Sequence, residues 1–137
     1  MMNRLITSFL LFFLVVFINP NHLNATTNEL PECVVITHCV RENLKVNDLE
    51  NSFKKATKIV TETPRTKIVE RTNSYIHAEA KTKWRRYTDD LLLKVIPEKG
   101  IIQVRSESRV GIGDNGVNQR RVDDLAYRLM TEPDSFS

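Results

Sequence analysis

Glycine and histidine are scarce in this chain of 137 residues, and each shortage excludes something. Four glycines occur, three of them within one short run, so few other positions readily accept a positive φ angle. The three histidines, His22, His38 and His77, are scattered, and neither a His-x-x-x-His nor a Cys-x-x-Cys spacing is present. We therefore expect no metal site and no cofactor.

Charge of one sign is also lacking, because 20 basic residues stand against 17 acidic ones. Residues 1–25 hold one basic and no acidic residue, so the rest of the chain carries 19 − 17 = +2. A balance this close gives no electrostatic argument for nucleic acid or for an anionic membrane surface. We expect no nucleic-acid partner.

The apolar run near the N-terminus is short. Leu5–Ile18 has fourteen residues, whereas a membrane-spanning helix needs about 20. Arg4 precedes the run, and a weak cleavage site follows it at Leu23-Asn24-Ala25, as in a secretory signal peptide. We expect residues 1–25 to export the chain to the periplasm, the thylakoid lumen or the outside of the cell. The alternative is that residues 5–18 anchor it in the membrane.

The only two cysteines, Cys33 and Cys39, lie in an extended segment, residues 26–46, that shows no clear period. Because an exported chain meets an oxidising compartment, we favour a disulfide between them. The alternative is a pair of free thiols. A zinc site would need more ligands than His38 adds.

Periodic patterns predict a single α+β domain over residues 47–130. Asn47 can cap a first helix, with Glu50 three residues later and an end before Pro64. Extended segments follow at 66–81, interrupted by a turn at 72–74, and at 86–96 and 101–110. Asn118 can cap a final helix, and residues 131–137 form a flexible tail. The apolar stripes of the two helices are Leu49, Phe53, Ala56 and Val60, then Val122, Leu125, Ala126 and Leu129.

Short turns between the strands indicate antiparallel pairing. We therefore expect a three- to four-stranded antiparallel sheet with an N-terminal and a C-terminal helix packed on it, as a two-layer sandwich. On the segment 86–96, Asp89 shares a face with leucines, which suggests partial burial. A buried carboxylate needs a partner, most simply an arginine of the neighbouring third strand.

The run 103–118 gathers most of the unusual chemistry of the chain. It contains the three clustered glycines, and Gly111-x-Gly113-x-x-Gly116 matches the dinucleotide-binding spacing. The expected context, antiparallel strands and a helix that starts only after the run, is not that of a dinucleotide fold. Arginines near glycine amides and a helix N-terminus can hold an anion. The alternative is that Asp89, Asp90 and Asp114 pair with these arginines in a structural network.

Several segments stand in a characteristic order: Cys33, Cys39-Val40, residues 75–79, 87–90, 103–111 and 114–118, then Arg121. In this order and spacing the chain resembles the domain of unknown function 1499 family over about residues 33–129. The resemblance implies a small, often exported bacterial or plastid domain without an established activity. Two departures are Leu92, where the family usually has an acidic residue, and the loop 34–38, where it is often rich in proline and serine.

We expect a non-enzymatic binding or accessory module whose partner is a small anionic ligand or a membrane-associated protein. The alternatives are a small hydrolase or isomerase that uses His77 or Asp89 as a base, and a structural subunit of a membrane-associated complex. A base at His77 requires Ser106, Ser108 or Asp89 within hydrogen-bond reach. The candidate ligand-binding residues are His77, Asp89, Arg105, Ser106, Ser108, Arg109, Asp114, Asn118 and Arg121.

Overall fold

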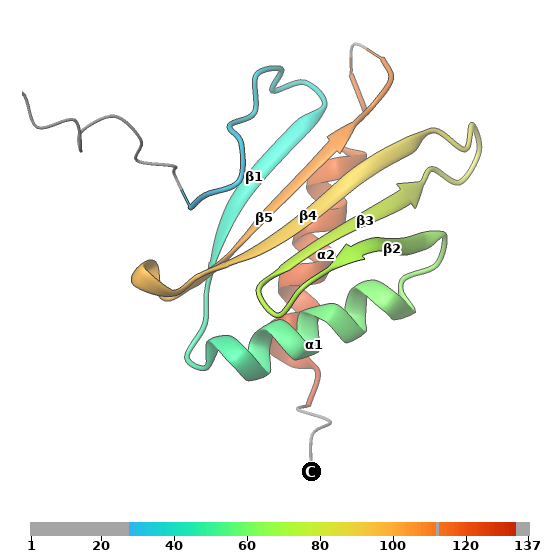
Figure 1. Ribbon diagram of the computed structural model, residues 1–137. Helices are drawn as coiled ribbons and strands as arrows, with labels where there is room; N and C mark the ends of the chain where they lie inside the picture. The colour runs from blue at the N-terminus through green and yellow to red at the C-terminus, as the bar shows by residue number, and fades with distance from the viewer. Residues whose placement is uncertain (1–27, 112, 134–137) are drawn as a thin grey trace, which may run out of the picture.

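A five-stranded antiparallel sheet, covered on one face by two helices, forms the fold (Figure 1). This computed structural model describes residues 28–111 and 113–133. The strands stand in the order β1-β5-β4-β3-β2. The elements are β1 Cys39–Lys45, α1 Leu49–Glu62, β2 Thr66–Arg71, β3 Tyr75–Lys81, β4 Thr88–Ile96, the 3-10 turn η2 Pro97–Lys99, β5 Ile101–Ser108 and α2 Val117–Thr131. The predicted α+β class is confirmed.

The predicted sheet was too small, and the first element is a strand rather than a helix. β1 lies at one edge and pairs only with β5, which begins 101 − 45 = 56 residues after β1 ends. The alternation of apolar and polar residues is hard to see in the sequence of β1, because Glu42 lies between Val40 and Leu44 on the face that the helices cover. The Glu42 carboxylate accepts a hydrogen bond from Gln119 of α2 at 2.7 Å. Because Glu42 contacts α2, a polar residue occupies a position where the two-residue period of a strand would predict an apolar one.

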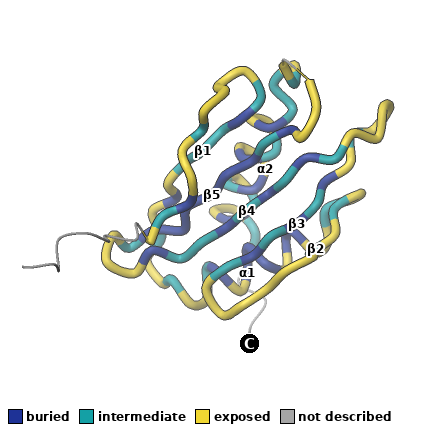
Figure 2. The backbone as a smooth tube through the Cα atoms, turned by 45° about the horizontal axis from the view of Figure 1, so that its top comes forward, coloured by how far each residue is buried: buried dark blue, intermediate teal, exposed yellow. Residues whose placement is uncertain are grey.

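The two helices bury the predicted apolar stripes against one face of the sheet (Figure 2). Phe53, Ala56 and Val60 of α1 are buried, and Leu49 packs at the margin of the same core. α2 buries its own stripe in the same way, through Val122, Leu125 and Leu129, with Ala126 partly buried. The predicted cap of α1 was one residue early: Asp48, not Asn47, accepts the Asn51 N–H at 3.0 Å.

Side chains of neighbouring strands line up in rows that alternate between the two faces of the sheet. Asp89 pairs in register with Ala80 and Ser108, and this row faces the helices. The next row joins Asp90 to residues 79 and 107 and faces the open side. The sheet therefore separates two sets of polar side chains that stand close together in the sequence.

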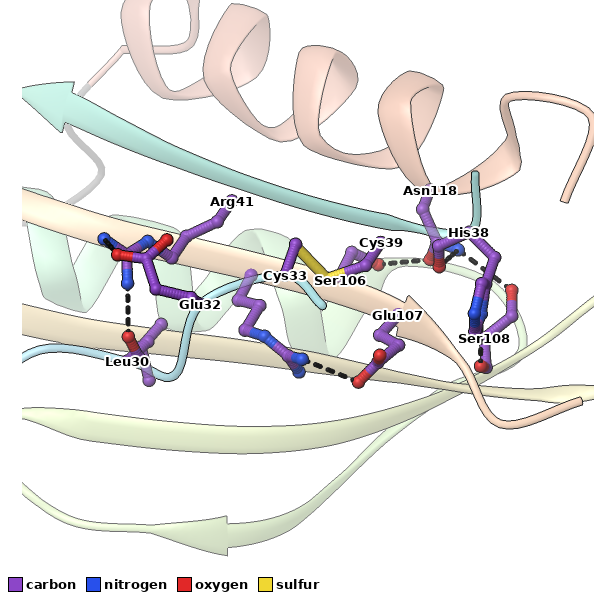
Figure 3. The surroundings of a disulfide bond; sticks show 11 residues. Leu30, Glu32, Cys33, His38, Cys39, Arg41, Ser106, Glu107, Ser108 and Asn118 are labelled. Atoms are coloured by element: carbon purple, nitrogen blue, oxygen red, sulfur yellow. Dashed lines mark hydrogen bonds and ion pairs between the residues drawn. A yellow bond between two sulfur atoms is a disulfide. The ribbon is translucent and has the colours of Figure 1, made fainter. Parts of the chain in front are cut away.

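A disulfide joins Cys33 to Cys39, as predicted, and ties the first described segment to β1 (Figure 3). This segment lies over the open face of β1 and β5. Leu30 is only 4% exposed there, and its N–H donates to Gln103 Oε1 at 2.6 Å. Arg41 of β1 donates to the Leu30 carbonyl at 2.6 Å. The segment is thus part of the folded domain.

The predicted targeting segment, residues 1–25, and the alternative anchor, residues 5–18, lie outside the described residues and stay predictions. Neither helix of the described part of the chain has the length and apolarity of a membrane span.

Candidate functional site

Asn118 is the centre of a buried hydrogen-bond network beneath the start of α2. It is 0% exposed, and its Oδ1 accepts from Ser106 Oγ at 2.6 Å. Its Nδ2 donates to Ser108 Oγ at 2.9 Å and to the His38 carbonyl at 3.0 Å. The network connects α2 to β5 and to the residue that precedes β1, at the place shown in Figure 3.

The predicted capping role of Asn118 was wrong, because Asn118 lies inside α2. The N-cap is Gly116, whose φ angle is 74°. The Asp114 carboxylate accepts the N–H of Gly116 at 2.9 Å and that of Asn118 at 2.7 Å, so Asp114 provides the capping oxygens. Burial alone would raise the pKa of Asp114, but these backbone donors hold that pKa below its usual value.

Asp89 and Arg121 form a buried ion pair at the edge of this network. Arg121 Nη2 lies 2.8 Å from Asp89 Oδ2, and the Asp89 side chain is 0% exposed. The expected partner was an arginine of the third strand, but Asp89 faces the helices and meets one from α2. Arg121 Nη1 also donates to Ser106 Oγ at 2.9 Å and to Asn118 Oδ1 at 2.6 Å. The second oxygen, Asp89 Oδ1, is buried and has no hydrogen-bond partner among the described residues.

A pocket of about 630 Å³ opens beside this ion pair, between the β3–β4 hairpin and the β5–α2 loop. Its polar lining includes Asp89, Ser108 and Arg121, and its apolar lining includes Trp84 and Val110. Five cationic residues and two acidic ones line it, which gives a formal charge of 5 − 2 = +3. The charged lining residues are Arg65, Lys81, Lys83, Arg85 and Arg121, with Asp89 and Asp114.

A second polar cluster lies on the open face of the sheet around Arg109. Arg109 Nε donates to Asp90 Oδ2 at 2.8 Å, and its Nη2 donates to Asp90 Oδ1 and to Glu79 Oε1, each at 2.7 Å. His77 Nε2 lies 2.6 Å from Asp90 Oδ1. The Arg109 guanidinium, and to a smaller extent His77, hold the pKa of Asp90 below its usual value. The carboxylates of Asp90 and Glu79 in turn raise the pKa of Arg109.

Arg105 also lies on the open face and is paired. Its Nη2 lies 2.8 Å from Glu107 Oε2, and its side chain is 10% exposed. Its Nε is buried without a hydrogen-bond partner in the described part of the chain. Arg105, Arg109 and Arg121 therefore each have a carboxylate partner, as expected for a structural network. Asp114 takes no part in this pairing.

Comparison with known protein families explains the characteristic order of the segments between Cys33 and Arg121. The sequence model of the family described as "Protein of unknown function (DUF1499)" matches residues 18–129. The chain belongs to the DUF1499 family. The predicted resemblance is confirmed, and a search of curated proteins finds no match. The DUF1499 match covers all five strands, α1 and most of α2.

The fold of this DUF1499 member brings together only part of the predicted site. Asp89, Ser106, Ser108, Asn118 and Arg121 meet on the helix face, with Asp114 above them at the start of α2. His77, Arg105 and Arg109 lie on the open face. His77 is thereby separated by the sheet from Ser106, Ser108 and Asp89, the groups that the hydrolase alternative required.

Two sets of residues in this DUF1499 domain were not among the predicted ligand-binding residues. Glu79 and Glu107 complete the open-face ion pairs. Glu107 shares a face with Arg105 on the same strand, whereas only strand register would have placed Glu79 of β3 beside Arg109. Residues 81–87, the end of β3 and the β3–β4 hairpin, supply much of the pocket lining, and their signal was visible as four cations and two aromatic residues within seven positions. No three His, Cys, Asp or Glu side chains within 28–111 and 113–133 stand close enough together to hold a metal ion.

Proposed function

We propose that this DUF1499 protein is an exported, non-enzymatic binding module whose ligand enters the pocket between the β3–β4 hairpin and the β5–α2 loop. One observation carries the proposal: Asp89 lines the pocket, and its Oδ1 is buried without a hydrogen-bond donor. An unsatisfied buried acceptor costs about 1–3 kcal/mol. A ligand that donates a hydrogen bond to Oδ1 recovers this free energy on binding.

The chemistry of the lining favours a small anionic ligand that also carries a hydroxyl group. The lining has a formal charge of +3, so it attracts anions. Asp89 is already neutralised by Arg121 at 2.8 Å, and it therefore offers an acceptor without a net negative charge. The hydroxyl would donate to Asp89 Oδ1, while the anionic group would lie toward the cations of the hairpin.

Binding is tested with sn-glycerol 3-phosphate as the probe, because it combines a phosphate with hydroxyl groups. We expect saturable changes in the amide NMR signals of Asp89, Ser108 and Asn115. Inorganic phosphate, which at neutral pH offers charge without the carbon-bound hydroxyls, should bind more weakly, and glycerol should not bind. Absence of saturable changes at these amides would refute the proposed site.

Two variants distinguish binding of the probe in the pocket from a general electrostatic attraction to the protein. Asp89→Asn keeps an oxygen for Arg121 but can place an N–H₂ donor where the acceptor was, so it should remove the preference for glycerol phosphate over phosphate. Asn115 is exposed at the mouth of the pocket with a φ angle of 53°, which aspartate also tolerates. Asn115→Asp should weaken probe binding several-fold, whereas the matched change Asn73→Asp, in the β2–β3 turn, should leave it unchanged.

Export is supported by the apolar run that follows Arg4 and by the disulfide between residues 33 and 39. Expression of the whole chain with a C-terminal tag, followed by mass spectrometry of the purified protein, identifies its first residue. We expect processing close to Ala25. A product that retains residues 5–18 in the membrane fraction would instead support the anchor.

A further inference from the structure

Three connections converge at one end of the sheet (Figures 1 and 2). They are the segment 33–38 before β1, the β3–β4 hairpin 82–87, and the β5–α2 loop, described at 109–111 and 113–116. Thr37 accepts the Asp114 N–H at its carbonyl at 3.3 Å, so the first and third connections touch. The second and third face each other across the pocket. We call these three connections together the tip.

The tip carries most of the exposed apolar surface. Of the nine large hydrophobic side chains that are exposed in the described part of the chain, six belong to it. Trp84 is 86% exposed, and Val34 and Ile36 are 89% and 82% exposed. The other three tip residues of this set are Val35, Tyr87 and Val110. Such a concentration on a domain with a well-filled core marks a surface that contacts something else.

The tip also carries unpaired positive charge, although the chain as a whole is nearly balanced. The β3–β4 hairpin 82–87 contains three cations, Lys83, Arg85 and Arg86, and no acidic residue. None of the three has a carboxylate partner among the described residues. Lys83 Nζ lies 5.2 Å from the centre of the Trp84 ring, and Arg85 donates to the Tyr87 hydroxyl at 3.4 Å. Cations and aromatic rings are thus interleaved at the most exposed point of the hairpin.

From this combination we infer that the tip docks on a membrane surface that contains anionic phospholipids. Tryptophan and tyrosine favour the headgroup layer of a bilayer, where one end of the ring is apolar and the other is wet. Lysine and arginine add attraction to anionic lipids. The apolar side chains come from three separate connections: the run Val34–Ile36, the pair Trp84 and Tyr87, and Val110. This suits insertion into a fluid layer, whereas a protein partner would need a matching pocket for each of them.

The membrane inference goes beyond the proposed ligand site, although Lys83, Trp84 and Arg85 belong to both. Val34 and Ile36 do not line the pocket, so their replacement tests docking alone. Asp89 lies at the buried end of the pocket and is not on the surface of the tip, so its replacement tests ligand binding alone.

Trp84 is the only tryptophan of the chain, and its fluorescence therefore reports on the tip directly. The protein recovered after expression is mixed with vesicles of phosphatidylcholine, with or without phosphatidylglycerol, after mass spectrometry has shown that all variants share one N-terminus. We expect a blue shift and quenching by brominated lipid with the anionic vesicles, weakened by salt, and little change with phosphatidylcholine alone. An emission spectrum that anionic vesicles leave unchanged would overturn the inference.

Vesicle co-sedimentation of variants completes the test. Lys83→Gln with Arg85→Gln should weaken binding to anionic vesicles about 25-fold, because each cation near such a surface contributes about fivefold. Val34→Ser with Ile36→Ser should weaken it at least about tenfold through the lost apolar contact. Two matched control pairs should bind as the wild type does: Lys45→Gln with Lys54→Gln, and Tyr127→Ser with Met130→Ser. Equal weakening by tip and control pairs would overturn the inference.

Discussion

Replacing Asn118 by aspartate distinguishes a helix cap from a buried connector. Asparagine and aspartate are about equally good caps, so a capping residue would tolerate the change within about 0.5 kcal/mol. A connector would not, because an aspartate carboxylate cannot donate to the His38 carbonyl or to Ser108 Oγ. The new carboxylate would also share the Arg121 guanidinium with Asp89, and both residues 89 and 118 are 0% exposed.

The magnitude follows from these contacts. Two lost hydrogen bonds cost about 1 kcal/mol each, and a second buried carboxylate beside Asp89 adds about 1 kcal/mol or more. We therefore expect Asn118→Asp to lower the free energy of unfolding by about 3 kcal/mol. With a urea dependence of about 1.5 kcal/mol per M, the unfolding midpoint moves down by about 2 M.

Urea unfolding followed by far-ultraviolet circular dichroism measures this shift. The matched control is Asn47→Asp, which adds the same charge at an exposed position just before α1 and should move the midpoint little. If the two variants have the same midpoint as the wild type, Asn118 does not connect α2 to β5 and the residues before β1 in the way described.

Three further outcomes are expected. Gly116→Ala should destabilise the protein by about 1 kcal/mol, because φ is +74° there, whereas Gly113→Ala, at a position without a positive φ, should be nearly neutral in the same urea assay. Serine substitution of both cysteines should cost about 2 kcal/mol, and reduction should lower the wild-type midpoint by a similar amount but leave the variant unchanged. Arg109→Gln should raise the pKa of Asp90 toward its usual value in an NMR titration. Because the folded-state pKa of Asp90 is the lower one, its stabilising contribution is present above the usual aspartate pKa and is lost as pH falls through the folded-state value. The variant should lose the part of this acid-sensitive stability that Arg109 contributes.

Local sequence patterns predicted most of the helices and strands, because the residues that define each of these elements lie close together in the chain. The stripe from Leu49 to Val60 and the stripe from Val122 to Leu129 each repeat with the helical period, and both face the core. β3 and β4 alternate between buried and partly exposed side chains, whereas β5 is buried on both of its faces. β1 was not predicted, because it is defined by its pairing with β5 and by the contact of Glu42 with α2, and a local sequence pattern contains neither.

The candidate site was harder to predict, because its geometry depends on how the strands pair and on contacts between residues that are far apart in the chain. Adjacent residues of a strand, such as Asp89 and Asp90, face opposite sides, but the placing of His77 relative to Asp89 required the pairing of β3 with β4. Asn118 had the sequence context of a cap. Only the approach of His38, 80 residues earlier in the chain, reveals it as a buried connector.

The pairing of β1 with β5 sets a sequence of events in folding. The hairpins β2–β3, β3–β4 and β4–β5 join neighbours in the chain and can form early, whereas β1 must wait for a strand that starts 56 residues after it ends. Because synthesis proceeds from the N-terminus, β1 is the first of the described strands to appear and the last to find its partner. Its disulfide closes over a separation of only six residues and needs none of that wait. The covalent link can thus be in place while β1 still depends on whatever keeps an unpaired strand from aggregating.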